Sequence, residues 1–380
     1  MKSSLPYVLM FSVLLGSCSP GATGMFAGLE TETKLVASGA LKLNATISSM
    51  AEDSNNFYAA GGLRLYVRAN TDLGTKVDWT SESIDSQTQT LAVRSIGAAE
   101  VYAVAGNGTT NKLYHRSGGA WAAVSLSGTD NPVDLVPVIG GDGSSVTHIL
   151  VVTETAPGSQ YYNSLYLLTS TTLTSPLLLT TSAGQSNLPV PVTSAASDGS
   201  SIYMVNKSFV WATDLTLSSA SLVTGVPQGK DYSSILIVSG TTSLDGVYLA
   251  TRDLGTSGGN VYFWTSANST GTAWQTPATV VSSASSSSTA VCFLSLLLPS
   301  STSSCVLVGT RNHGYGELTP TKFAAVPTLT TVTGNYDVST LPTSGITLLY
   351  VTPDSSQTLV LGTNSLGLWT QGSDKTWKQQ

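Results

Sequence analysis

The chain has 380 residues and a formal net charge of −6, and only 10% of its side chains are charged, compared with about 25% in a typical soluble domain. Lys and Arg do not cluster anywhere, which argues against nucleic-acid binding, because that function needs grouped cations to neutralise phosphates. Apolar runs are short, and Gly, Ser, Thr, Asn and Pro interrupt them. This pattern is typical of many strands joined by tight turns and predicts an all-β protein.

The first residues form an apolar segment that is too short to cross a bilayer. Lys2 precedes the apolar run from Leu5 to Leu15, whereas a transmembrane helix needs about 20 apolar residues. Such a segment is typical of a secretory signal. It ends in Leu15-Gly16-Ser17-Cys18, which resembles the lipobox of bacterial lipoproteins. The resemblance implies a signal peptide over residues 1–17 and lipidation of Cys18; an ordinary signal peptide with an incidental Cys18 is the alternative.

The segment after Cys18 is expected to be a lipidated tether over residues 18–30, and a single domain is expected over residues 31–380. Several acyl chains on one residue would give stable anchoring. Ser19 follows the cysteine, and by resemblance to enterobacterial lipoproteins it favours the outer membrane. The expected location is therefore the bacterial cell envelope, on the periplasmic side or at the cell surface.

A pair of residues, usually an apolar residue before an aromatic one, recurs through the rest of the chain. The copies are Leu65-Tyr66, Leu113-Tyr114, Leu165-Tyr166, Val210-Trp211, Val261-Tyr262, the weaker Gly314-Tyr315, and Leu368-Trp369. Successive aromatic residues are 48, 52, 45, 51, 53 and 54 positions apart. Propeller blades repeat with a period of this size.

Each pair has further predicted strands around it. Two apolar strands precede it, of which the first has mainly small or aliphatic residues, and a Trp follows it in four copies, at positions 79, 121, 274 and 377. Four strands in each of seven repeats predict a seven-bladed β-propeller of four-stranded antiparallel blades, with six or eight blades as alternatives. The small residues are expected at the axis, and most aromatic rings are expected to be core packing. Residues 33–41 are a candidate outer strand that would close the ring.

Two cysteines lie on either side of a predicted hairpin turn. Cys292 and Cys305 are placed almost symmetrically about the turn at residues 299–302. A cross-strand disulfide is within geometric reach there, and export to an oxidising compartment would favour it. Two buried free thiols are the alternative.

Four turns between predicted third and fourth strands resemble the Asp-box, the repeated turn of sialidase-type propellers, whose pattern is about Ser-x-Asp-x-Gly-x-Thr-Trp. They are residues 71–79, 116–121, 266–274 and 372–377. None matches completely: Asp72 and Asp374 supply carboxylates in the first and the last stretch, Asn268 would be a substitute in the third, and the second has neither. The resemblance implies a sialidase-like propeller architecture. It implies little about activity, because Asp-boxes face away from sialidase active sites.

Sialidase chemistry would, by this resemblance, need three arginines around a carboxylate, a Tyr nucleophile with a Glu partner, and an Asp acid. The chain has six arginines but no Phe-Arg-Ile-Pro-type motif. Arg252 and Arg311 end the second strands of neighbouring repeats, where they would share an entrance or simply lie in solvent. His115, His148 and His313 lack metal-ligand spacing. We therefore predict no catalytic residue, no metal and no cofactor.

A glycine-rich stretch, Gly140-Gly141-Asp142-Gly143-Ser144-Ser145, has no predicted helix after it. A phosphate-binding loop is therefore not expected there. We expect Asp142 to form a tight hairpin turn instead.

The connections between second and third strands vary most in length, and the longest are residues 153–164 and 252–260. Residues 225–234 lie between blades on the same side. Elongated loops on a rigid scaffold often carry function, and Tyr is enriched in binding patches; drift in loop length is the alternative. The binding candidates on this face are Tyr161, Tyr162, Lys230, Asp231, Tyr232, Arg252, Asp253, Arg311 and His313.

Together these features predict a lipid-anchored envelope propeller that acts as a non-enzymatic binding or scaffold module. Its expected partner is an envelope protein or a glycan. Two alternatives stay open: a sialidase-like glycan hydrolase, and an adhesin that faces a host.

Overall fold

The computed structural model describes residues 46–70, 79–154, 162, 164–170, 172–179, 188, 190–226, 231–240, 244–252, 260–264, 275–279, 293–297, 305–310, 315–318, 345–352, 358–364, 366–371 and 377–380. The regular elements in these ranges are strands. Within the same ranges there is no helix with the length and apolar character needed to cross a membrane.

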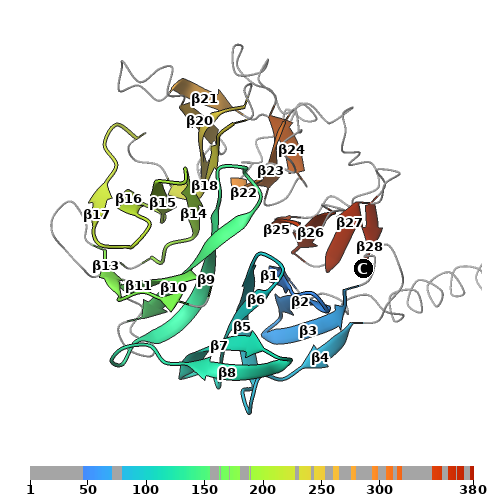
Figure 1. Cartoon of the computed structure of the whole chain (residues 1–380). Coiled ribbons are helices and arrows are strands. Elements are labelled where there is room, and N and C mark those ends of the chain that lie inside the picture. Colours follow the sequence, from blue (N-terminus) through green and yellow to red (C-terminus); the bar gives the residue numbers. More distant parts are fainter. Residues whose placement is uncertain are drawn as a thin grey trace, which may run out of the picture.

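The described strands follow one another as seven antiparallel meanders, which we call blades, arranged around a ring (Figure 1). The strands of blades 1 to 3 are β1 (Ile47–Glu52), β2 (Asn56–Gly61), β3 (Arg64–Ala69), β4 (Thr80–Glu82), β5 (Gln89–Ile96), β6 (Glu100–Gly106), β7 (Asn111–Ser117), β8 (Ala120–Val124), β9 (Asn131–Ile139), β10 (Val146–Glu154), β11 (Ser164–Thr169), β12 (Thr172–Leu173) and β13 (Leu177–Leu178).

Blades 4 to 7 continue the same order. Their strands are β14 (Ser194–Ser197), β15 (Ser201–Val205), β16 (Val210–Asp214), β17 (Ala220–Leu222), β18 (Asp231–Val238), β19 (Gly246–Arg252), β20 (Asn260–Trp264), β21 (Gln275–Thr279), β22 (Phe293–Leu297), β23 (Val306–Thr310), β24 (Tyr315–Leu318), β25 (Ile346–Val351), β26 (Leu359–Thr363), β27 (Leu368–Gln371) and β28 (Trp377–Gln379). The predicted all-β propeller of four-stranded antiparallel sheets is confirmed, with three described strands in blade 6. The described strands form seven blades, and the predicted blade number for the whole chain stays a prediction.

The hydrophobic core is divided among the interfaces between blades. Seven clusters of buried side chains each join two neighbouring blades, and one of them joins blade 7 to blade 1. The largest fully buried side chains include Trp211, Tyr58, Tyr114, Tyr166 and Tyr248. Every blade contributes to two of the seven clusters, so burial of apolar side chains on both faces of each sheet supplies the main stabilising term. The prediction that most aromatic residues are core packing is confirmed for these rings.

Blades 1 and 7 are also linked by polar contacts. The Thr347 hydroxyl donates to the carbonyl oxygen of Ile47 at 2.6 Å. The buried guanidinium of Arg68 donates from Nη1 to Gln380 Oε1 at 3.1 Å. The outer strand predicted at residues 33–41 lies outside the described residues.

Blades 3 and 4 share one continuous sheet. Their innermost strands β9 and β14 pair in parallel, with Ala195 opposite Val138 and Ala196 opposite Ile139. Inside each blade, by contrast, neighbouring strands run antiparallel.

The two faces of the ring carry different turns. The turn face has the connections from first to second and from third to fourth strands, and the loop face has the remaining connections. On the turn face, Asp53, Asp142 and Asp198 each accept backbone N–H bonds from the residues two and three positions later, at 2.7–3.0 Å. The predicted Asp142 turn is therefore confirmed, and such Asx turns close tight hairpins.

The stretch at residues 116–121, which resembles an Asp-box, forms a shorter turn than that pattern requires. Gly118 and Gly119 join β7 to β8 with φ angles of 58° and 85°, and Ser117 pairs with Ala120. Two residues with positive φ are typical of a type I′ hairpin. The other three stretches lie wholly or largely outside the described residues.

Candidate functional site

Three of the predicted binding residues that the structure describes lie on the loop face, namely Tyr162, Asp231 and Arg252. Asp231 begins β18 and pairs in register with Arg252, the last residue of β19. Tyr162 precedes β11, and its N–H donates to the carbonyl oxygen of Leu188 at 2.9 Å. Tyr161, Lys230, Asp253, Arg311 and His313 lie outside the described residues, so the predicted approach of Arg252 to Arg311 stays a prediction.

Asp231, on blade 5, has a charged neighbour on blade 4, Lys207, which the sequence did not predict. Lys207 Nζ, in the turn between β15 and β16, lies 3.5 Å from Asp231 Oδ2, and the two side chains are 52% and 33% exposed. The N–H of Tyr232 donates to the Lys207 carbonyl oxygen at 3.0 Å. Asn206 Oδ1 accepts the N–H groups of Ser208 and Phe209, both at 2.9 Å, which holds the turn in place. The pair therefore has an ordered position on an exposed surface.

Tyr232 is not the surface residue that the sequence suggested. It is 3% exposed and belongs to the core cluster between blades 4 and 5. Burial raises the pKa of its hydroxyl to about 12. The expectation failed because residues 225–234 were expected to form a connection between blades, whereas β18 already begins at Asp231 and every residue of it after Asp231 is buried.

Tyr162 is half-buried, and its environment is acidic. Burial raises the pKa of Tyr162, and the nearby carboxylate of Glu154 raises it further. Glu154 Oε2 in turn accepts a hydrogen bond from Asn131 Nδ2 at 3.3 Å. These groups place a tyrosine and a carboxylate together at the loop-face end of blade 3.

Of the cysteines predicted to form a disulfide or to be lipidated, the structure describes Cys305. Cys305 is buried just before β23. Cys292 and Cys18 lie outside the described residues. Both assignments stay predictions.

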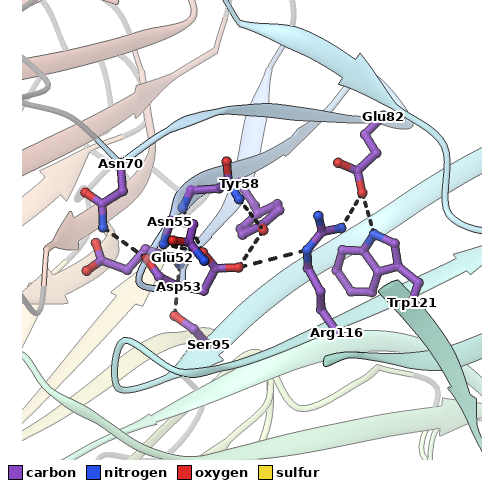
Figure 2. Close-up of polar contacts among 10 residues, drawn as sticks. Glu52, Asp53, Asn55, Tyr58, Asn70, Glu82, Ser95, Arg116 and Trp121 are labelled. Atoms are coloured by element: carbon purple, nitrogen blue, oxygen red, sulfur yellow. Dashed lines mark hydrogen bonds and ion pairs between the residues drawn. The ribbon is translucent and has the colours of Figure 1, made fainter. Parts of the chain in front are cut away.

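A second polar cluster, between blades 1 and 2, centres on Arg116 (Figure 2). Its guanidinium forms an ion pair with Glu82, and its Nε lies 3.9 Å from Asp53 Oδ2. The charged group also lies over the rings of Tyr58 and Trp121, 5.1 and 5.3 Å from their centroids. The cluster therefore joins the β1–β2 turn to the outer strands of both blades.

Hydrogen bonds complete this cluster. Trp121 Nε1 donates to Glu82 Oε1, and the Tyr58 hydroxyl donates to Asp53 Oδ2, both at 2.6 Å. Burial and the Asp53 hydrogen bond raise the pKa of Tyr58. Because every charged group already has a partner inside the cluster, we interpret it as a structural clamp between two blades.

A third feature is a cavity of about 470 Å³ on the axis of the ring. Its lining comes from the innermost strands or their flanking residues in all seven blades, and the β9–β10 turn contributes Ser144. Small residues were expected to fill this space. Ser48, Ser194 and Ser234 do line it, but they stand beside larger groups such as Leu91 and Tyr350, and a void remains.

Two opposite charges face this cavity, Arg94 on β5 and Asp134 on β9. Arg94 Nε donates to the Leu135 carbonyl oxygen at 3.3 Å, and Nη2 donates to the Ser48 carbonyl oxygen at 3.4 Å. Asp134 Oδ1 accepts the N–H of Leu135 at 2.8 Å. The guanidinium thus spans the inner strands of three successive blades.

Both charges are only partly exposed to solvent. Burial lowers the pKa of Arg94, and Asp134 opposes that shift. Burial raises the pKa of Asp134, and Arg94 opposes that shift in turn. Within the described ranges, no group of His, Cys, Asp and Glu side chains is arranged to hold a metal ion. The one sequence signal for this site is a charged residue inside each of two predicted innermost strands.

Comparisons with known proteins show which fold this is. No family model and no curated protein sequence matches the chain. Solved β-propellers do: YCF48 bound to D1 peptide has a TM-score of 0.55 at 13% identity, over 87% of this chain and 93% of that one. YCF48 from Cyanidioschyzon merolae has a TM-score of 0.54 at 11% identity, over 86% and 96%.

Two larger proteins contain a similar propeller. An ancestral GH74 enzyme has a TM-score of 0.59 at 12% identity, over 90% of this chain and 46% of the enzyme. The extracellular domain of the BT4673 two-component system from B. thetaiotaomicron has a TM-score of 0.52 at 13% identity, over 86% and 38%. The present chain therefore spans less than half of these two. At such identities the likeness is one of fold, and by fold the chain is a β-propeller.

Proposed function

We propose that this protein is a non-enzymatic binding module of the bacterial cell envelope, which recognises a protein or glycan partner through its loop face. The observation that supports the proposal is the ordered, exposed pair of Lys207 and Asp231, which bridges blades 4 and 5. An exposed ion pair contributes at most about 1 kcal/mol to stability. Its charges stay available to a partner, where they give specificity and speed association.

The neighbouring groups suit the same role. Tyr162 and Glu154 stand at the loop-face end of the adjacent blade 3, and Arg252 ends the strand that pairs with Asp231. Tyrosine and arginine are enriched in binding interfaces. A rigid ring beneath these residues would reduce the ordering cost of association.

Related folds support a role in recognition without deciding the partner. One YCF48 structure contains a bound D1 peptide, and the GH74 propellers are enzymes. Since fold alone does not determine function, the test must cover protein, glycan and hydrolysis.

The experiment places a photo-crosslinking amino acid at Ser208, next to Lys207 on the loop face, and combines it with a glycan array. We expect one partner. Lys207→Glu or Asp231→Lys should lower its affinity about tenfold or more, because a charge-assisted contact is lost. The double exchange Lys207→Glu/Asp231→Lys restores the local ion pair but not the partner contact. Lys112→Glu, the same charge change on blade 2, is the matched control.

Two outcomes would overturn the proposal. The first is a partner whose affinity is equal in the wild type and in both loop-face variants. The second is release of reducing sugar from a glycan panel, which would show an enzyme instead.

Anchoring is a separate part of the proposal. We propose lipidation of Cys18, which would hold the propeller at the membrane. Mass spectrometry of the N-terminal peptide should show acyl chains, and Cys18→Ala should move the protein from the detergent phase to the aqueous phase. An unmodified Cys18 in the mature protein contradicts this part alone.

A further inference from the structure

The lining of the axial cavity contains two opposite charges, Arg94 and Asp134, that do not contact each other. Arg94 and Asp134 both line the space of about 470 Å³. Ion pairs within 4.0 Å do occur among the described residues, at His115, Arg116 and Lys207, but Arg94 and Asp134 do not form one. The two charges therefore influence each other across a gap.

Neither charge is fully satisfied by the protein groups around it. Arg94 uses two of its N–H groups on backbone carbonyl oxygens, whereas a guanidinium carries five. Asp134 has one backbone hydrogen bond, which Oδ1 accepts, and a carboxylate can accept about four. Both side chains are only partly exposed, and charged groups with reduced access to water are stabilised by partners, so a ligand that supplies both partners would bind favourably.

The rest of the lining suits a small amphiphilic molecule. Ser194 and Ser234 bring hydroxyl groups, and Leu91, Val133 and Ile235 bring apolar surface. The volume lies within the range of about 300–1,000 Å³ that is usual for small-molecule sites. A neutral sugar would use the hydroxyl groups but would leave both charges without a counter-charge.

A route leads to the cavity from the turn face. A hollow of about 110 Å³ shares Ser95, Ser144 and Tyr350 with the main cavity and reaches Gly97 and Ser145. These last two residues are exposed. The route therefore opens on the face opposite to the proposed partner surface.

We propose that the axial cavity binds a small zwitterion, an α-amino acid or a short peptide with free ends, whose carboxylate pairs with Arg94 and whose ammonium group pairs with Asp134. The site is separate from the loop face. Ligand binding there can succeed or fail whatever becomes of the proposed partner.

The test is thermal shift followed by calorimetry on the full chain. The probes are the common amino acids and a set of dipeptides, together with the N-acetyl and amide derivatives of the best binder. We expect at least one zwitterion to bind. Its N-acetyl and amide forms, each of which lacks one charge, should bind about tenfold more weakly or worse, because each loses a charge-assisted hydrogen bond.

Variants assign the two ends of the ligand. Arg94→Met should abolish the preference for a free carboxylate, and Asp134→Asn should abolish the preference for a free ammonium group. Lys207→Met removes a charge on the loop face and should leave binding unchanged. Because Arg94 also spans three blades, circular dichroism must confirm that its variant folds; Asp134→Asn, which is isosteric, provides the test if it does not.

Three results would overturn the proposal. In the first no probe binds, in the second the charged and blocked forms bind equally, and in the third a neutral sugar binds in their place with both variants unaffected.

Discussion

Replacement of Arg116 by methionine should lower the free energy of unfolding by about 3 kcal/mol. Removing one partner from a buried ion pair costs about 3–5 kcal/mol, but here the Glu82 and Asp53 side chains keep 28% and 17% exposure, so part of that penalty is relieved by water. The lost contacts of the cation with the Tyr58 and Trp121 rings add about 0.5–1 kcal/mol each. Methionine retains much of the packing of the arginine stem.

The comparison is with Lys207→Met, which breaks the exposed pair on the loop face. With side chains 52% and 33% exposed, that pair should contribute no more than about 0.5 kcal/mol. Urea denaturation followed by tryptophan fluorescence measures both variants. If Arg116→Met destabilises the protein no more than Lys207→Met does, the Arg116 cluster does not stabilise the contact between blades 1 and 2. Low exposure of an ion pair would then fail to predict its contribution to stability.

Three further predictions use single positions. Leu63 is 48% exposed and has a φ of 65°, a left-handed conformation that costs a residue with a Cβ about 1 kcal/mol. Leu63→Gly should therefore raise the melting temperature. A lower melting temperature would mean that the contacts of the leucine side chain contribute more than the backbone strain costs. Hydrogen bonds from Ser218 and Thr216 hold the pKa of Asp214 well below its usual range. The ¹³C chemical shift of its carboxyl group should therefore still report the ionised form at pH 3, and the turn should lose these hydrogen bonds only as pH falls further. Titration of Asp214 near pH 4 would contradict the observed geometry. Burial raises the pKa of Tyr232 to about 12, so the stability that it contributes is complete below about pH 10 and is lost as pH rises toward 12; difference absorbance at 295 nm against Tyr232→Phe should show the late ionisation, and a transition near pH 10 would indicate an exposed ring.

The propeller could be predicted because its strands obey local rules. Leu113-Tyr114 and its copies mark the third strand of each blade, and their even spacing along the chain reports a repeat that each blade must satisfy separately. The Asp142 turn could be predicted for the same reason, since an Asx turn is decided by a few adjacent residues.

The sites could not be predicted in the same way, because they depend on contacts between blades. Arg94 and Asp134 are 40 positions apart, and nothing local shows that both face one void. Arg116 stands in a stretch that resembles an Asp-box, yet it is held by Glu82 of the preceding blade. Tyr232 shows the limit at the start of a strand: every residue of β18 after Asp231 is buried, and the sequence does not show where the connection between blades ends and the strand begins.

The parallel pairing of β9 with β14 makes the ring mechanically uneven. At other interfaces single main-chain hydrogen bonds are described, such as that from the Tyr232 N–H to the Lys207 carbonyl oxygen, whereas here a strand ladder adds Ala195 and Ala196 to the sheet of blade 3. Partial opening of a protein follows its least cooperative boundaries. Blades 3 and 4 should therefore exchange their amide hydrogens as one unit. Any widening of the axial cavity should occur by movement of the other blades relative to this shared sheet.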